Sequence, residues 1–180
     1  MFAKLKNNFE KPLFTTIEGL TSFAGIDGKG VGHKKVWSPD AEQFYAVIPK
    51  RYWDDFHLTL MTINRDILAH TDTEIITTIN FYLDAGGDDI DTIFFEPLVD
   101  KPKTFQIENQ IDGYIFDKSE LKEVGRFRAK PMECWALDVK KIHSVEGHVT
   151  GIRKAVTIGT FVHNYDAVVE MFKETGCLPS

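Results

Sequence analysis

The 180-residue sequence has few cysteines and no long hydrophobic run. Its two cysteines, Cys134 and Cys177, are too few for a disulfide scaffold, so we expect free thiols in a reducing compartment. No apolar stretch approaches the roughly 20 residues that a membrane-spanning helix needs. The N-terminal stretch carries two lysines but no apolar core after them, unlike a secretory signal. These absences predict a cytoplasmic protein with no membrane partner.

Positive charge is also scarce, and arginine is its rarer source. The chain has 16 lysines and 5 arginines, and its net charge is −6. An acidic surface binds a phosphate backbone poorly, so a nucleic-acid partner is disfavoured. The 43% hydrophobic and 27% charged content is that of an ordinary globular protein. The length suits one domain over residues 1–180.

Several common functional motifs are missing. The sequence has no Gly-x-Ser-x-Gly, Cys-x-x-Cys or His-Glu-x-x-His motif. Residues 25–32 contain four glycines but lack the Walker spacing, so they predict a loop. The acidic residues 88–91 lack the remainder of a calcium-binding loop. These features leave other side-chain combinations to carry any chemistry.

Short strand patterns dominate the chain from residue 56 onward. Apolar and β-branched residues gather in short segments separated by turns: 56–63, 67–70, 75–83, 92–96, 114–116, 126–128, 134–137 and 155–162. This pattern predicts a mainly β sandwich or barrel. A helix is expected over residues 164–176, capped by Asn164 and ended by Gly176. Residues 41–48 suit a short helix or a strand, residues 1–36 are the least readable part of the chain, and the segment 97–130 matches no motif.

Four residues stand out as candidates for chemistry. His70 and Asp72 have the i, i+2 spacing that places two side chains on one face of a strand, where both can reach one metal ion. His143 would complete a set of two histidines and one carboxylate, which leaves coordination positions open. Arg153 follows ten residues later, and arginine grips carboxylates with paired hydrogen bonds. The glycines between His143 and Arg153 predict a hairpin that carries both residues into a barrel interior.

Each of these residues alone has an ordinary structural explanation. His70 would suit a strand end beside a loop aspartate, and His143 would suit a basic surface stretch after two lysines. Arg153 would suit an exposed ion pair. Together and in this order, however, the pieces resemble the 2-oxoglutarate/Fe(II) oxygenase family. Segments 77–84 and 131–138 resemble the family's strands, and the resemblance covers residues 56–162.

The resemblance implies a fold and a branch of the family. The implied fold is mainly β with flanking helices, a double-stranded β-helix of the jelly-roll or cupin-like type. Its core would span residues 56–162, after an N-terminal extension over residues 1–55. The pattern from Thr78 to Tyr82 is similar to the prolyl-hydroxylase-like branch. The compact size is similar to members from bacteria and phages, which implies the cytoplasm of a bacterium or of a phage-infected host.

The resemblance also implies site residues and cofactors. His70, Asp72 and His143 correspond to the catalytic iron ligands, and Arg153 corresponds to the residue that binds the distal carboxylate of 2-oxoglutarate. Tyr82 corresponds to a tyrosine that touches the same carboxylate. Residues that would line the cosubstrate pocket are Thr78, Asn80 and Thr157. The implied cofactors are Fe(II), 2-oxoglutarate as cosubstrate and O₂, with ascorbate as an optional reductant.

The implied activity is hydroxylation of an aliphatic carbon with release of succinate and CO₂. A prolyl residue of a peptide or protein is the favoured substrate, and a small molecule is the open alternative. Asp72 favours a hydroxylase, because halogenases of this fold have a small residue there. Gly159 stands where the nucleic-acid-demethylating branch has a second arginine. Two other hypotheses remain: a non-catalytic cupin-like barrel that binds a metal or ligand, and a metal-free β-sandwich for protein interactions.

Overall fold

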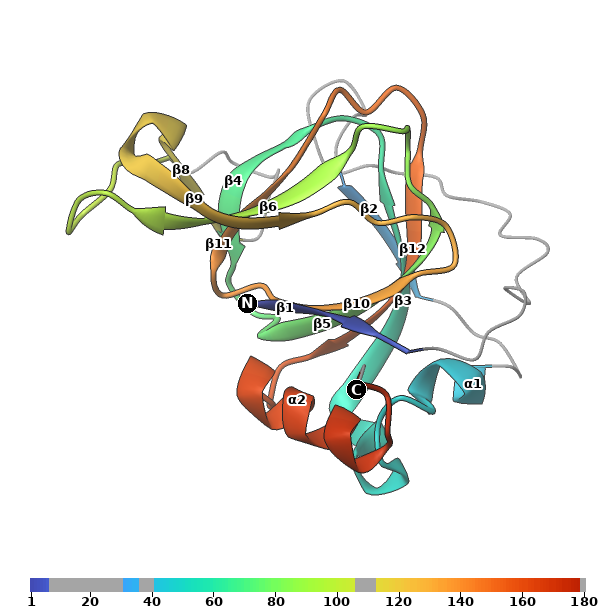
Figure 1. The fold of residues 1–180 in the computed structure, drawn as a ribbon. Helices are drawn as coiled ribbons and strands as arrows, with labels where there is room; N and C mark the ends of the chain where they lie inside the picture. The colour runs from blue at the N-terminus through green and yellow to red at the C-terminus, as the bar shows by residue number, and fades with distance from the viewer. Residues whose placement is uncertain (7–30, 36–40, 106–112, 179–180) are drawn as a thin grey trace.

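A computed structural model describes residues 1–6, 31–35, 41–105 and 113–178. Two antiparallel sheets face each other across the interior (Figure 1). The major sheet has the strand order β1 (Phe2–Leu5), β10 (Cys134–Asp138), β5 (Thr77–Asp84), β12 (Arg153–Thr160), β3 (Phe56–Ile63) and β2 (Val31–Lys35). The minor sheet has the order β7 (Thr104–Phe105), β8 (Gly113–Phe116), β4 (Ile67–Asp72), β11 (Ile142–Glu146), β6 (Asp91–Pro97) and β9 (Leu121–Phe127).

The order of the strands along the chain identifies the fold. From β3 to β6, successive strands alternate between the major and the minor sheet, and from β9 to β12 they alternate again. The two runs interleave, so that β12 lies between β3 and β5 while β11 lies between β4 and β6. All pairings are antiparallel, as in a jelly roll. The chain therefore forms the double-stranded β-helix that the sequence predicted.

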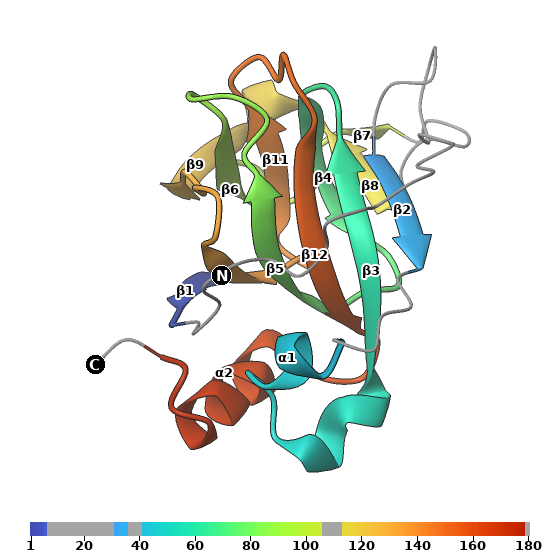
Figure 2. The same cartoon turned by 90° about the vertical axis from the view of Figure 1, so that its right-hand side faces the viewer.

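The helices cover the outer face of the major sheet. They are α1 (Ala41–Tyr45), the 3-10 helix η2 (Lys50–Asp55) and α2 (Tyr165–Glu174), and they lie together beside this sheet (Figure 2). Ile79 and Phe81 of β5 pack in one buried cluster with Val168 and Phe172 of α2. Because successive strand residues point to opposite faces, Asn80 is directed into the interior between the sheets. The outer face thus carries the largest apolar cluster, and the inner face combines smaller apolar clusters with polar side chains.

The C-terminal helix begins and ends where the sequence predicts. The Asn164 side chain accepts a hydrogen bond from the amide of Ala167 at 2.9 Å, which caps α2. Gly176 follows the helix with a φ of 71°, the left-handed conformation that favours glycine. At the other end of the chain, residues 41–48 form a helix only as far as Tyr45. No helix in the described ranges is long and apolar enough to span a membrane.

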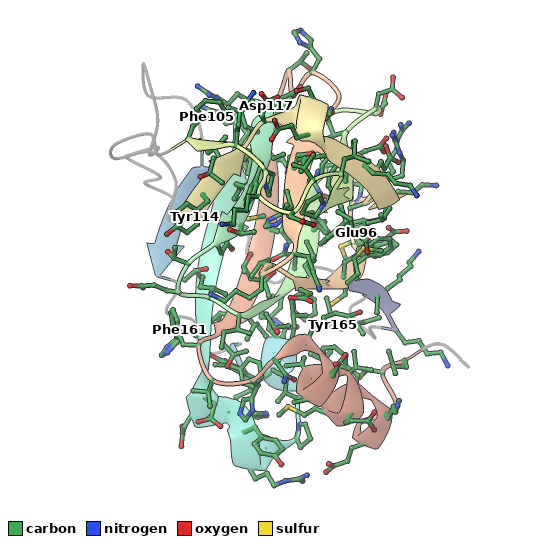
Figure 3. All side chains as sticks on the ribbon, turned by 90° about the vertical axis from the view of Figure 1, so that its left-hand side faces the viewer. Glu96, Phe105, Tyr114, Asp117, Phe161 and Tyr165 are labelled. Carbon is green, nitrogen blue, oxygen red and sulfur yellow. The ribbon has the colours of Figure 1, made fainter. Side chains whose placement is uncertain are left out.

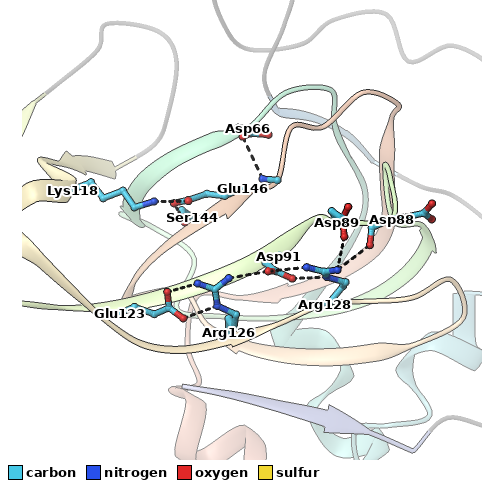
Figure 4. A network of polar contacts seen from close by, with 11 residues as sticks. Asp66, Asp88, Asp89, Asp91, Lys118, Glu123, Arg126, Arg128, Ser144 and Glu146 are labelled. Atoms are coloured by element: carbon cyan, nitrogen blue, oxygen red, sulfur yellow. Dashed lines mark hydrogen bonds and ion pairs between the residues drawn. The ribbon is translucent and has the colours of Figure 1, made fainter.

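The described part of the segment 97–130, which matches no motif but contains the predicted strands 114–116 and 126–128, extends the minor sheet. Strands β7 and β8 add to its edge beyond β4, and a 3-10 helix, η3 (Lys118–Glu120), precedes β9. Phe105 and Tyr114, each about half exposed, lie on these added strands (Figure 3). On the other flank, Asp91 of β6 accepts hydrogen bonds from Arg126 and Arg128 (Figure 4). This charge cluster ties β6 to β9 and the segment that follows it.

The predicted hairpin between His143 and Arg153 is wrong. β11 belongs to the minor sheet and β12 to the major sheet, so residues 147–152 cross from one sheet to the other. The spacing and glycines of such a crossing are the same as those of a hairpin, which is why the sequence did not distinguish them. The crossing nevertheless keeps both side chains in the interior, but on opposite walls.

Candidate metal and carboxylate site

Three of the predicted residues come together on the inner face of the minor sheet. His70 and Asp72 lie on β4, and His143 lies directly opposite His70 on β11. One potential ligand atom from each residue lies within 4.8 Å of the others. The two imidazole rings are 4.3 Å apart between centroids, and His70 Nε2 is 3.4 Å from Asp72 Oδ1. Within the described ranges this is the only such group of three metal-ligating residues.

A β-bulge directs His70 inward. Strand β4 has three residue steps between its pairings with Val145 and His143, whereas β11 has two. The extra residue shifts the alternation, so that Ile67 and His70 face the same side of the sheet. Ile67 packs in the interior with Ile63 and Val145, at the end of the barrel away from Asp72. The bulge therefore lets one strand contribute both to the apolar filling and to the triad.

Backbone carbonyls orient both imidazoles. His70 Nδ1 is 2.8 Å from the carbonyl of Leu68, and His143 Nδ1 is 3.0 Å from the carbonyl of Lys141. A neutral imidazole that donates from Nδ1 has a free lone pair on Nε2. This carbonyl-to-histidine contact is the usual outer support of a metal-binding histidine. Both rings are therefore set to present Nε2 toward Asp72.

Burial keeps His143 in the form that binds metals. Desolvation, together with the nearby His70, lowers the pKa of His143 to about 4, although Asp72 and the Lys141 carbonyl act in the opposite direction. His143 is therefore neutral at pH 7. Phe94 of β6 stacks on its ring, with centroids 5.7 Å apart and planes 25° apart. Two imidazoles and one carboxylate form a nitrogen and oxygen donor set that fits a divalent transition metal with open coordination positions.

Arg153 is a buried cation that pairs with no carboxylate of the described residues. Its side chain is 1% exposed at the start of β12, on the opposite wall from the triad. Nη2 donates to Thr92 Oγ1 at 2.9 Å, whereas Nε and Nη1 have no hydrogen-bond partner in the part of the chain that the structure describes. The guanidinium lies over the Tyr82 ring, 4.6 Å from its centroid. A buried charge is costly unless it is paired, so this arrangement suits a carboxylate that arrives with a ligand.

Polar side chains continue from Arg153 along the major sheet. Thr157 of β12 pairs with Asn80 of β5 and donates from Oγ1 to Asn80 Oδ1 at 2.8 Å. Asn80 Nδ2 in turn lies 3.4 Å from the Tyr82 hydroxyl. Thr78 shares this face of β5, and its buried hydroxyl has no partner among the described residues. The structure thus gathers on one wall all five residues predicted to hold the cosubstrate.

Two residues of the site were not anticipated from the sequence. Thr92 holds the Arg153 guanidinium, and Phe94 flanks His143. Both belong to β6, whose sequence was recognisable only as an apolar strand. Their role depends on which strand lies beside β11, and nothing in the local sequence states that neighbour. A polar residue in a buried strand, as at position 92, is the only signal that was available.

Comparisons with known proteins leave the assignment to the structure itself. No family model matches the chain, and no curated protein matches it. Among solved structures, E. coli YcfD matches with 11% identity over 94% of this chain and a TM-score of 0.44. Ectoine synthase from P. lautus matches with 12% identity over 96% of this chain and 89% of its own, with a TM-score of 0.26. The chain spans 43% of the YcfD chain. The fold is assigned from the strand order described above and not from these two structures.

Proposed function

We propose that this chain is an Fe(II)- and 2-oxoglutarate-dependent dioxygenase that hydroxylates an aliphatic carbon. The observation that carries the proposal is Arg153, a buried cation with two unpartnered donor groups in the same interior as a His-Asp-His triad. A metal site alone does not need a second, unpaired cation on the facing wall. A dicarboxylate with one end at the metal and the other at Arg153 gives both features a use.

The residues of the chain have separate tasks in this proposal. His70, Asp72 and His143 would hold the metal, with both imidazoles oriented by the backbone carbonyls behind them. Arg153 would pair the distal carboxylate of 2-oxoglutarate. Fe(II), when bound, supplies the redox chemistry in which 2-oxoglutarate, O₂ and a C–H group become succinate, CO₂ and a C–OH group.

The major-sheet wall would orient the cosubstrate. The Tyr82 ring lies against the Arg153 guanidinium and fixes its plane, while the hydrogen bond from Thr157 holds the Asn80 amide. The free Thr78 hydroxyl is available to a ligand. Because this wall is buried, water is excluded from the pairing of Arg153 with a carboxylate, which strengthens that pairing.

The substrate class is proposed from the resemblance of segment 77–84 to prolyl-hydroxylase-like strands. It is a prolyl residue of a peptide or protein, with a free small molecule as the alternative. A non-catalytic cupin-like barrel is the second candidate function, because the triad by itself would suit it equally well. The two functions differ in whether Arg153 and a 2-oxo acid act together.

Anaerobic titration of the metal-free protein with Fe(II) and then 2-oxoglutarate tests the proposal. A weak visible charge-transfer band is expected when the 2-oxo acid chelates ferrous iron, and succinate should form once O₂ is admitted. His70→Ala and His143→Ala should lose the iron, whereas His57→Ala, at an exposed position of β3, should keep it. Iron without the band would favour the cupin-like barrel, and absence of iron would refute the triad.

A further inference from the structure

Three loops meet at the end of the barrel where Arg153 lies. They are residues 64–66 between β3 and β4, residues 85–90 between β5 and β6, and residues 147–152 between β11 and β12. Beneath them Ile63, Ile67, Ile90 and Val145 form a buried apolar cluster that fills this end. Arg153 is the first residue of β12 after the third loop, so the path of that loop sets where the guanidinium begins.

The Asp66 carboxylate holds the third loop in place. Oδ1 accepts from the amide of Val149 at 2.8 Å, and Oδ2 accepts from the amides of His148 at 3.2 Å and Gly147 at 3.4 Å. Asp66 faces this turn from the neighbouring loop (Figure 4). Gly147 and His148 both have positive φ, 127° and 65°. Glycine adopts positive φ freely, but at His148 this conformation is strained and persists only where its surroundings fix it; here the carboxylate supplies three of the contacts to the turn.

The loop of residues 147–152 is also closely packed against the loop of residues 85–90. A Cβ on Gly147 would lie 1.9 Å from the carbonyl oxygen of Asp89. Gly151 donates to the carbonyl of Gly86 at 3.2 Å, and a Cβ on Gly86 would lie 2.9 Å from Cβ of Arg153. Movement of residues 147–149 would therefore be passed to the backbone that carries Arg153.

We infer that Asp66 is a positioning residue for the carboxylate site. It acts through Arg153 and does not contact the ligand; this inference rests on the proposed function. Paired hydrogen bonds between arginine and a carboxylate need a fixed geometry, and small displacements weaken them. Loss of the Asp66 contacts should therefore reduce recognition of the distal carboxylate and leave metal binding on the other wall intact.

Asp66→Asn is the test variant, because it replaces one accepting oxygen with an NH₂ group that faces backbone N–H donors. The probes are 2-oxoglutarate and pyruvate, a 2-oxo acid without the distal carboxylate, each titrated anaerobically into the Fe(II)-loaded protein. The variant should bind 2-oxoglutarate about 10-fold more weakly, as expected for partial loss of a charge-assisted pair. Its affinities for pyruvate and Fe(II) should stay within about twofold of the wild type.

Asp117→Asn is the matched control, since the Asp117 carboxylate also accepts a backbone N–H, but that of Ser119 in η3 rather than those of residues 147–149. It should change neither probe. In an Arg153→Met background, Asp66→Asn should cause no further loss of 2-oxoglutarate binding. Equal weakening of both probes, unchanged 2-oxoglutarate binding, or a loss that persists without Arg153 would overturn the inference. A wild type that binds both acids equally would instead refute the proposed function, and the inference with it.

Discussion

Replacement of Arg153 by methionine should stabilise the ligand-free protein and weaken 2-oxoglutarate binding. Methionine keeps the aliphatic stem and removes a charge that has two unpartnered donors at 1% exposure. A buried unpaired charge costs several kcal/mol. Against this, the variant loses about 2 kcal/mol from the contact with Tyr82 and about 2 kcal/mol from the bond to Thr92. We expect a net gain of about 1–2 kcal/mol in the free energy of unfolding, or about 2–8 °C in Tm.

Saturating 2-oxoglutarate should make the wild type more stable to unfolding than the Arg153→Met variant. Two charge-assisted hydrogen bonds at about 1.5 kcal/mol each correspond to roughly 100-fold in Kd. At 100 times the wild-type Kd, 2-oxoglutarate stabilises the wild type by about 2.7 kcal/mol. At that concentration the variant is near its own Kd and gains about 0.4 kcal/mol. The assay is thermal unfolding of both proteins under anaerobic Fe(II), with and without 2-oxoglutarate.

The two halves of this prediction fail in different ways. If the ligand-free variant is less stable than the wild type, the guanidinium is not an uncompensated charge, and the site needs no incoming carboxylate. If 2-oxoglutarate raises the Tm of both proteins equally, the ligand does not reach Arg153. Pyruvate serves as the control ligand, because without a distal carboxylate it should shift both proteins by the same amount.

Three further predictions concern the framework. Hydrogen bonds from Arg128 and Arg126 lower the pKa of Asp91 below its usual 3.8. The ionised carboxylate therefore stabilises the fold at neutral pH, and this contribution is lost as the pH falls below 3.8. Asp91→Asn should flatten the acid limb of a plot of the free energy of unfolding against pH. Gly147→Ala should destabilise by more than about 3 kcal/mol in urea unfolding, whereas Gly176→Ala, also at positive φ but in open space, should cost about 1 kcal/mol. Asn164→Ala should cost about 1 kcal/mol through loss of the α2 cap, and no change in the urea midpoint would contradict that role.

Local pattern predicted much of this fold, and long-range pairing accounts for most of the rest. The strand at 75–83 and the helix after Asn164 were recognisable because their periodicity and capping residues are local signals. The spacing from His143 to Arg153 placed both residues correctly in the interior but suggested a hairpin, because a short connection does not reveal which sheet its second strand joins. Within the segment 97–130, the strand at 114–116 was recognisable, whereas β7 and most of β9 carried no local signal and depend on their pairing with β8 and β6.

In the candidate site, too, local sequence signals were readable and long-range contacts were not. The i, i+2 spacing of His70 and Asp72 was sufficient to place them together, but a bulge that no motif marks directs that pair inward. Thr92 could not be predicted, because its contact with Arg153 spans the interior between two sheets. Neither could Asp66, whose three acceptor contacts are made with a loop more than 80 residues away. Motif order identified the residues of the proposed chemistry, while their supports depend on tertiary packing.

The proposed enzyme differs from a metal-binding barrel at Arg153, where the ligand-free protein is destabilised by a buried and incompletely paired charge. Two histidines and a carboxylate on facing strands are compatible with storage, structure or catalysis, so the triad alone decides little. A buried guanidinium with two open donors is different, because an apolar residue of similar size would make the free protein more stable. Such a group is retained where a ligand completes it. In the proposed function that ligand is an anion, and a chelating 2-oxo acid with a second carboxylate would engage both the triad and Arg153.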